Sequence, residues 1–88
     1  MNNMYEIDWT RKALKQLMKL DSRQDRDAVY GAVDGLTAWP DCRNIKALSG
    51  HEYSYRLRVG RFRVLFDVHE AVKVIAIQEV RKRDERTY

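Results

Sequence analysis

The 88-residue chain has one cysteine, one proline and four glycines, and each scarcity excludes a class of protein. Cys42 cannot form a disulfide within the chain, which excludes a disulfide-stapled secreted scaffold and is typical of a reducing compartment such as a bacterial cytoplasm. The few prolines and glycines exclude a collagen-like repeat or a flexible linker. No run approaches the ~20 apolar residues of a membrane helix. The first residues lead directly into an alternating segment, so no signal peptide is expected.

Familiar catalytic signatures are also missing. There is no Gly-rich phosphate loop, no Walker lysine and no Ser-His-Asp arrangement. Cys42 and the two histidines do not have the spacing of a zinc site, so no metal is predicted. His51 and His69 fall in predicted turns and are interpreted as exposed residues rather than bases. Cys42 is interpreted as a bystander, because Asp41 and Arg43 offset each other's effect on the thiolate.

Length and composition predict a single globular domain over residues 1–88, with 44% hydrophobic and 34% charged residues. The net charge of +4 has an uneven distribution. Residues 1–55 carry 8 Lys or Arg and 8 Asp or Glu, whereas residues 56–88 carry 9 and 5. The basic excess indicates either a polyanion partner, such as nucleic acid, or a solvated basic face without a partner.

The first 40 residues predict one strand and two helices. Alternation over residues 5–9 predicts a half-buried strand with inward Tyr5, Ile7 and Trp9. Thr10 is a candidate N-cap for a helix over residues 11–20, whose apolar positions are Ala13, Leu14, Leu17 and Met18. Ser22 and Asp25 resemble a capping box for a second helix, which carries Val29, Ala32, Val33 and Leu36 and ends before Pro40.

The second half of the chain predicts a sheet, because the apolar period changes from 3.6 to 2. A short extended piece around Ile45 precedes three meander strands, over residues 53–59, 62–68 and 72–80. Connections of two to four residues require antiparallel neighbours. The predicted fold is α+β with the order β-α-α-β-β-β, in which a helical hairpin packs on one face of an antiparallel-rich twisted sheet. The predicted core includes Tyr53, Leu57, Phe62, Val64 and Phe66.

Basic residues cluster on the predicted meander strands. Arg56 and Arg63 should lie near one another across the turn at Gly60, and clustered like charges are unfavourable unless an anion binds there. A phosphate matches the planar fork of arginine, and the terminal Tyr88 could stack on a base. The alternative is that these arginines are ordinary surface residues and that Tyr88 is a frayed end.

Four segments resemble the RelE/ParE toxin superfamily over nearly the whole chain: I-K-A-L-S-G at Ile45–Gly50, Y-R-L-R-V-G at Tyr55–Gly60, R-F-R-V-L-F at Arg61–Phe66 and R-K-R-D-E-R-T-Y at Arg81–Tyr88. The resemblance implies a toxin of a type II toxin–antitoxin system. RelE-type members cut messenger RNA in the ribosomal A site without a metal, through attack of a ribose 2′-hydroxyl on the adjacent phosphorus. It also implies a cognate antitoxin, and the first helix, with Lys12, Lys15 and Lys19, is a candidate docking surface.

Matching the family motif residue by residue gives Arg56, Arg63, Arg83 and Tyr88 as candidate catalytic residues. Arg81 is an alternative to Arg83 after a small register change, and Tyr88 lies one residue closer to Arg83 than in typical RelE members. Ser54 stands where some relatives have a lysine, so one cation is missing. The other candidate RNA-binding residues are Lys46, Arg58, Arg61, Arg81 and Lys82.

Two other functions remain open. ParE-type members share the fold, inhibit DNA gyrase and lack the cationic and tyrosine set. A non-catalytic nucleic-acid-binding or protein-binding module would use the same basic face, and substitution of Arg63 would then weaken binding without abolishing a reaction.

Overall fold

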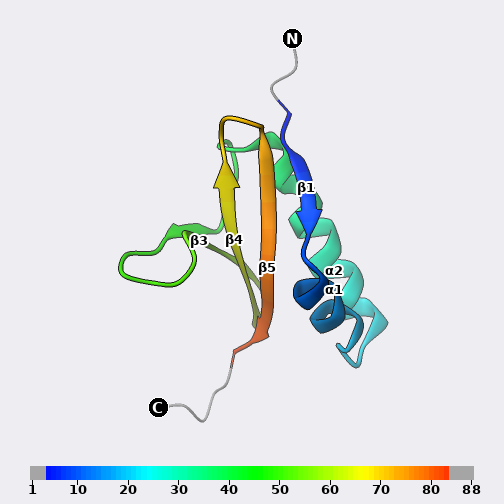
Figure 1. Cartoon of the computed structure of the whole chain (residues 1–88). Helices are drawn as coiled ribbons and strands as arrows, with labels where there is room; N and C mark the ends of the chain where they lie inside the picture. Colours follow the sequence, from blue (N-terminus) through cyan, green and yellow to red (C-terminus); the bar gives the residue numbers. More distant parts are fainter. Residues whose placement is uncertain (1–3, 84–88) are drawn as a thin grey trace.

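A computed structural model describes residues 4–83 as two α-helices and a single five-stranded sheet with the strand order β1-β5-β4-β3-β2 (Figure 1). Neither helix in this part of the chain has the length and apolar character needed to span a bilayer. The elements are β1 (Glu6–Trp9), α1 (Arg11–Met18), α2 (Arg23–Asp34), a 3-10 turn (Gly35–Ala38), β2 (Ile45–Ala47), β3 (Tyr55–Val59), β4 (Phe62–His69) and β5 (Val74–Lys82).

Both helices begin at the predicted caps. The Thr10 hydroxyl accepts a hydrogen bond from the Ala13 amide, and the Ser22 hydroxyl accepts one from the Asp25 amide, each at 3.2 Å. The Thr10 hydroxyl also donates to the Ile77 carbonyl at 2.8 Å, which ties the start of α1 to β5. These caps confirm the two helical segments, because each satisfies an amide that has no partner inside its helix.

The prediction for the first helix is wrong at two points. The helix ends at Met18 rather than Leu20, and only half of its apolar positions are buried. Ala13 and Leu17 lie in the core, whereas Leu14 is 44% exposed and Met18 is 65% exposed. A short helix resting on a sheet buries only the side that faces it, so the outer apolar pair of α1 faces solvent.

The meander confirms the predicted antiparallel strands, with boundaries shifted by two residues at two places. Gly60 and Arg61 form a two-residue hairpin between β3 and β4, and Gly60 has the positive φ of 56° that such a turn requires. The first of these strands starts at Tyr55 rather than Tyr53, and the last one spans Val74–Lys82 rather than 72–80. The extended piece around Ile45 is an edge strand, β2, paired antiparallel to β3.

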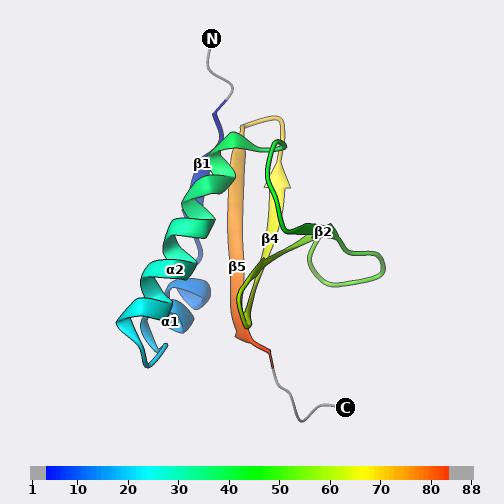
Figure 2. The same cartoon turned by 180° about the vertical axis from the view of Figure 1, so that it is seen from behind.

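The N-terminal strand β1 pairs in parallel with β5, from Glu6 opposite Val74 to Trp9 opposite Ile77. The edge of β5 beyond this pairing is completed by α1, where the Gln16 side-chain oxygen accepts a hydrogen bond from the Val80 amide at 2.7 Å. The helices therefore cover one face of the sheet, and β1 forms one of its edges. Figure 2 shows the loop from β2 to β3 on the other side of β5 from the helices.

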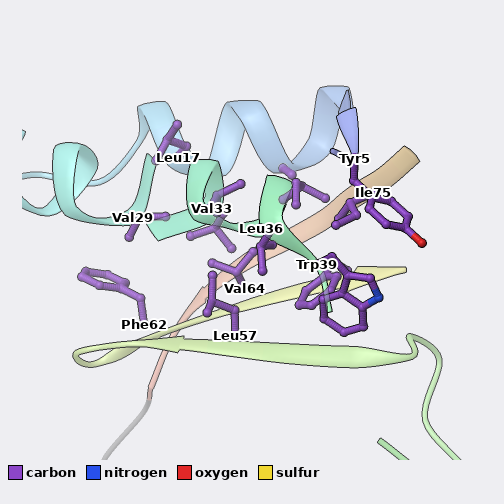
Figure 3. Close-up of a cluster of buried hydrophobic side chains, with 14 residues drawn as sticks. Tyr5, Leu17, Val29, Val33, Leu36, Trp39, Leu57, Phe62, Val64 and Ile75 are labelled. Carbon is purple, nitrogen blue, oxygen red and sulfur yellow. The ribbon is translucent and has the colours of Figure 1, made fainter. Parts of the chain in front are cut away.

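The core lies between the helices and one face of the sheet (Figure 3). Leu57, Phe62, Val64 and Phe66 belong to it, as predicted, together with residues of both helices. Tyr53 is a correction: it lies before β3, outside the core cluster, and its hydroxyl donates to Glu79. The open face of the sheet, opposite the helices, therefore holds the side chains that alternate with the core residues.

Candidate nucleic-acid interface

Cross-strand register aligns basic residues in two rows on the open face of the sheet. In one row Arg58, Arg63 and Arg81 stand directly opposite one another on β3, β4 and β5. In the other row, Lys46 on β2 faces Arg56 on β3, and the row continues through Leu65 on β4 to Glu79 on β5. Like charges directly opposite each other destabilise a sheet, so this face needs negative charge from the protein or from a ligand.

A small cleft of about 140 Å³ opens among these arginines at the β3–β4 hairpin. It is shallow and polar, and its size suits a phosphate group better than a drug-like molecule. It brings together three of the candidate catalytic residues that lie far apart in the sequence, Arg56, Arg63 and Arg83. The lining residues are Arg56, Arg58, Gly60, Arg61, Phe62, Arg63 and Arg83.

Arg56 and Arg63 line the same cleft, as expected, but they are not directly opposite each other. The residue directly opposite Arg63 is Arg58, while Arg56 pairs with Leu65, two residues further along the same face. The side-chain Nε of Arg56 is buried and has no hydrogen-bond partner among the described residues. A buried donor without an acceptor is unfavourable by roughly 1–3 kcal/mol, and the same residue lines the adjacent cleft.

Arg81 and Arg83 occupy different environments. The Arg81 guanidinium donates through Nε to a carboxylate oxygen of Glu79 at 2.8 Å, and Arg81 does not line the cleft. Arg83 does line the cleft, and its amide donates to the Arg61 carbonyl at 2.7 Å, which fixes its backbone beside the β3–β4 turn. Of the two arginines, Arg83 therefore has the geometry for a contact with a bound phosphate.

Glu79 is the site residue that the sequence analysis missed. It is 5% exposed and lies in the row of Arg56 and Leu65, next to a β-bulge between Leu65 and Phe66. Its carboxylate accepts hydrogen bonds from Arg81 at 2.8 Å, the Tyr53 hydroxyl at 2.8 Å and Lys12 at 3.1 Å. The available signal was an acidic residue near the end of a mostly apolar segment, two positions before an arginine.

These contacts shift the acid–base properties of the groups involved. The hydrogen bond from Arg81, followed by those from Tyr53 and Lys12, lowers the pKa of Glu79 to about 2, although burial acts in the opposite direction. The hydrogen bond to Glu79 raises the pKa of Tyr53 to about 12. Glu79 is therefore charged and Tyr53 neutral across the physiological pH range.

The other predicted RNA-binding residues do not all reach the cleft. Arg61 lines it and also lies 3.5 Å from the Asp25 carboxylate. Lys46 is exposed on the same face, at the edge strand. Lys82 pairs with Phe62 and lies in a separate groove beside the connection between α1 and α2. Tyr88 lies outside the described residues.

The remaining titratable candidates lie apart from this cleft. His51 and His69 are exposed, and the ring nitrogen of His51 accepts a hydrogen bond from the Tyr53 amide. Burial, followed by the Asp41 charge, raises the pKa of the Cys42 thiol, so the offset expected from Arg43 is not seen. In the part of the chain from residue 4 to residue 83, no group of three His, Cys, Asp or Glu residues could hold a metal ion.

Comparison with known proteins gives a family and a fold. Residues 7–87 match the family described as ParE toxin of the type II toxin–antitoxin system parDE. No curated protein matches the sequence. Solved structures that share this fold include RelE toxins, alone or in complex with RelB.

A RelBE toxin–antitoxin complex from Mycobacterium tuberculosis shares 25% identity with a TM-score of 0.77, and covers 91% of this chain and 99% of that one. An archaeal RelE–RelB complex from Pyrococcus horikoshii shares 25% identity with a TM-score of 0.78, over 93% of this chain and 98% of that one. The isolated RelE toxin of E. coli shares the fold at 20% identity, with a TM-score of 0.78, over 94% and 88%. The family match and the shared fold agree with the resemblance of the sequence motifs, and the chain belongs to the RelE/ParE family of type II toxin–antitoxin toxins.

Proposed function

We propose that this toxin is a metal-independent endoribonuclease that cleaves messenger RNA on the ribosome, in the cytoplasm. The observation that carries the proposal is the cleft that gathers Arg56, Arg63 and Arg83, with a buried guanidinium nitrogen that has no acceptor within residues 4–83. A cluster of this kind suits a phosphate whose negative charge increases during the reaction.

In the proposed reaction a ribose 2′-oxygen attacks the adjacent phosphorus. The new O2′–P bond forms as the P–O5′ bond breaks, which leaves a 2′,3′-cyclic phosphate and a 5′-hydroxyl. The 2′-hydroxyl loses a proton and the leaving 5′-oxygen gains one. Arg63 and Arg83 would stabilise the charge on the phosphorane oxygens, and Arg56 would hold the same phosphate.

The arginines of the cleft are suited to stabilise negative charge but not to transfer protons. Arginine has a pKa above ~12 and is a poor base. Tyr53 keeps its proton, because its pKa is raised to about 12 by Glu79. The candidate for proton transfer is Tyr88, which follows the C-terminal arginines in the sequence and whose alternative role is to stack on a base. A toxin with strong charge stabilisation and no strong base depends on the ribosome to place the 2′-hydroxyl in line with the phosphorus.

The second candidate function is inhibition of DNA gyrase. It is favoured by the name of the matched family, which is that of ParE toxins. The cleft favours the nuclease, because a protein that acts only by binding gyrase has no need of a phosphate-sized pocket with an unpaired donor. A non-catalytic RNA-binding module would use the same cleft without cutting.

The partner proposed for the other side of the molecule is a cognate antitoxin. On α1 the exposed Leu14 and Met18 line a shallow groove together with Lys15 and Lys19. An antitoxin segment with apolar and acidic side chains would match this surface. Lys12, which was grouped with these lysines, is instead bonded to Glu79 at 3.1 Å.

The proposed activity is tested by adding the purified toxin to a coupled translation reaction and mapping messenger 5′ ends by primer extension, with and without ribosomes. We expect cuts in A-site codons that require ribosomes. An Arg63→Ala/Arg83→Ala variant should cleave the messenger at least ~100-fold more slowly, since removal of one such donor typically has an effect of that size. Arg23→Ala, an exposed arginine on α2, is the matched control and should cut normally.

Each alternative gives a different result. An intact messenger combined with growth arrest and inhibited DNA supercoiling would indicate a gyrase inhibitor. Binding to ribosomes or RNA that disappears in the double variant, without any cleavage by the wild type, would indicate a binding module.

A further inference from the structure

A negative charge stands inside the basic surface, although it opposes the binding of a polyanion. Glu79 lies on the open face in register with Leu65 and Arg56, and the next outward position on its strand is Arg81. It is 5% exposed and accepts three hydrogen bonds, from side chains of α1, β5 and the loop before β3. A buried carboxylate that is so fully bonded is part of the architecture of this face rather than a chance surface charge.

We infer that Glu79 is a positioning residue that serves as the internal counter-ion of the arginine rows, keeping Arg81 out of the cleft and fixing Tyr53 across the open face of the sheet. Its effect on cleavage rests on the proposed function. Its effects on charge, on binding of RNA and on Tyr53 do not.

The first step concerns Arg81. By register Arg81 stands directly opposite Arg63, so its guanidinium would be expected to join the cleft. Instead its Nε is held at 2.8 Å from a Glu79 oxygen, and the side chain does not line the cleft. Arg58, Arg63 and Arg81 are three like charges side by side in one row, and the Glu79 carboxylate offsets part of their mutual repulsion.

The second step concerns Tyr53. The amide of the following residue, Ser54, donates to the Asp67 side chain on β4 at 2.8 Å, while the Tyr53 hydroxyl reaches Glu79 on β5 at 2.8 Å. The side chain therefore spans β4 on the open face. Leu65, which faces the same way by register, is only 4% exposed although no helix covers it. The hydrogen bond to Glu79 thus ties Tyr53 to the residue that stands directly opposite Leu65.

The third step concerns the link to the helical layer. Lys12 of α1 donates to the same oxygen of Glu79 as Tyr53 does. These partners lie 67 and 26 residues from Glu79 in the sequence, so the carboxylate joins three separate parts of the chain next to the phosphate cleft. The raised pKa of Tyr53 and the lowered pKa of Glu79 agree with this geometry.

The test compares Glu79→Gln with Asp67→Asn. Both substitutions remove one negative charge from the same sheet face and retain a side chain of the same size. Asp67 accepts hydrogen bonds from the Ser54 amide and the Gln78 side chain and forms no ion pair with an arginine within residues 4–83, so its variant controls for the loss of one negative charge on this face. The probe is a short 2′-O-methyl oligouridylate, which a 2′-hydroxyl nuclease cannot cleave, and binding is measured by fluorescence anisotropy at several salt concentrations.

We expect Glu79→Gln to bind the probe more tightly and with a steeper salt dependence, by about 0.7 in the slope of log K against log salt, because Arg81 becomes one additional phosphate contact. Asp67→Asn should leave the slope unchanged. In the double variant Glu79→Gln/Arg81→Gln the slope should return to that of the wild type. Equal slopes for Glu79→Gln and Asp67→Asn, or a double variant that stays steep, would overturn the inference.

A second measurement uses the protein alone. Titration of the tyrosine ring carbons by NMR should find one tyrosine with a pKa of about 12, which is absent in Tyr53→Phe and moves toward the ordinary value of 10.0 in Glu79→Gln. If the Tyr53 pKa stayed at the wild-type value in a folded Glu79→Gln protein, the inference would also be overturned. Both measurements avoid cleavage, so a toxin that proves not to be a nuclease leaves this test intact. If the toxin does cleave, Glu79→Gln should bind RNA more tightly and cut it more slowly, a split that simple loss of stability would not produce.

Discussion

Arg56 combines a functional position with an unfavourable environment. Its Nε is buried without an acceptor in the described part of the chain, and its side chain lines the cleft. Active sites and binding sites often retain such unfavourable groups, because the ligand supplies the missing partner. Arg56 is therefore expected to lower the stability of the free toxin and to raise its affinity for phosphate.

The substitution Arg56→Met tests this balance. We expect the free energy of unfolding to stay constant or rise by up to about 1 kcal/mol, because the buried unpaired N–H disappears, while messenger cleavage falls at least ~10-fold. Urea denaturation and primer extension measure the two effects. Arg58→Met is the control, since Arg58 is exposed in the same cleft and should show no gain in stability. A loss of more than about 1 kcal/mol in Arg56→Met would show that the guanidinium has an acceptor in the free protein.

The first helix depends on β5 for more than hydrophobic packing. Thr10 serves two elements, since its hydroxyl accepts from the Ala13 amide and donates to the Ile77 carbonyl. Gln16 of the same helix accepts from the Val80 amide, where β1 no longer covers the edge of β5. An unpaired strand edge at this place would expose backbone donors, and α1 satisfies one of them with a side chain.

The two helix caps therefore make unequal contributions. Thr10→Val should lower the free energy of unfolding by about 2 kcal/mol, through loss of the cap and of the bond to β5, whereas Ser22→Ala should lower it by about 1 kcal/mol. Urea denaturation measures both. Thr10→Ser keeps the hydroxyl and should cost clearly less than Thr10→Val. Equal losses for Thr10→Val and Ser22→Ala would mean that the bond to Ile77 contributes nothing.

The molecule separates its two proposed partners by placing them on different sides of one sheet. The arginine cleft lies on the open face, while Leu14 and Met18 of α1 line the groove. The helix α1 belongs to the layer on the opposite side of the sheet (Figure 1). Lys12 of α1 reaches around to Glu79, whereas Lys15 of α1 and Lys19, which caps its C-terminus, line the groove.

A variant with Lys15→Glu/Lys19→Glu should separate the two functions. We expect its affinity for the cognate antitoxin to fall at least ~10-fold, through repulsion of an acidic segment, and its rate of messenger cleavage to stay unchanged. Isothermal titration calorimetry and primer extension measure the two effects, with Arg23→Glu on α2 as the control. Unchanged antitoxin affinity would place the antitoxin elsewhere on the toxin.

The sequence alone determined the local features of this protein, because they depend on residues close together in the chain. Thr10 and Ser22 marked the helix starts, Gly60 marked the hairpin turn, and alternating side chains marked the meander strands. The boundary errors at Tyr53 and Leu20 have a common cause, since apolar spacing continues past the point where the backbone stops pairing. The motifs around the arginines also carried the family resemblance, which the family match then confirmed.

Only the tertiary structure decided which charges meet. The parallel pairing of β1 with β5 joins residues 68 positions apart in register, Ile7 with Ile75, and no local pattern encodes such a contact. Arg83 lines the cleft, whereas Arg81 bonds a carboxylate whose other partners, Lys12 and Tyr53, come from distant segments. Glu79 is an ordinary acidic residue in the sequence, and becomes the counter-ion of the basic face only after folding has buried it among those partners. Burial and long-range pairing determine how strongly charged groups interact. The sequence therefore identified the basic residues of the open face, whereas their partners became known only from the tertiary structure.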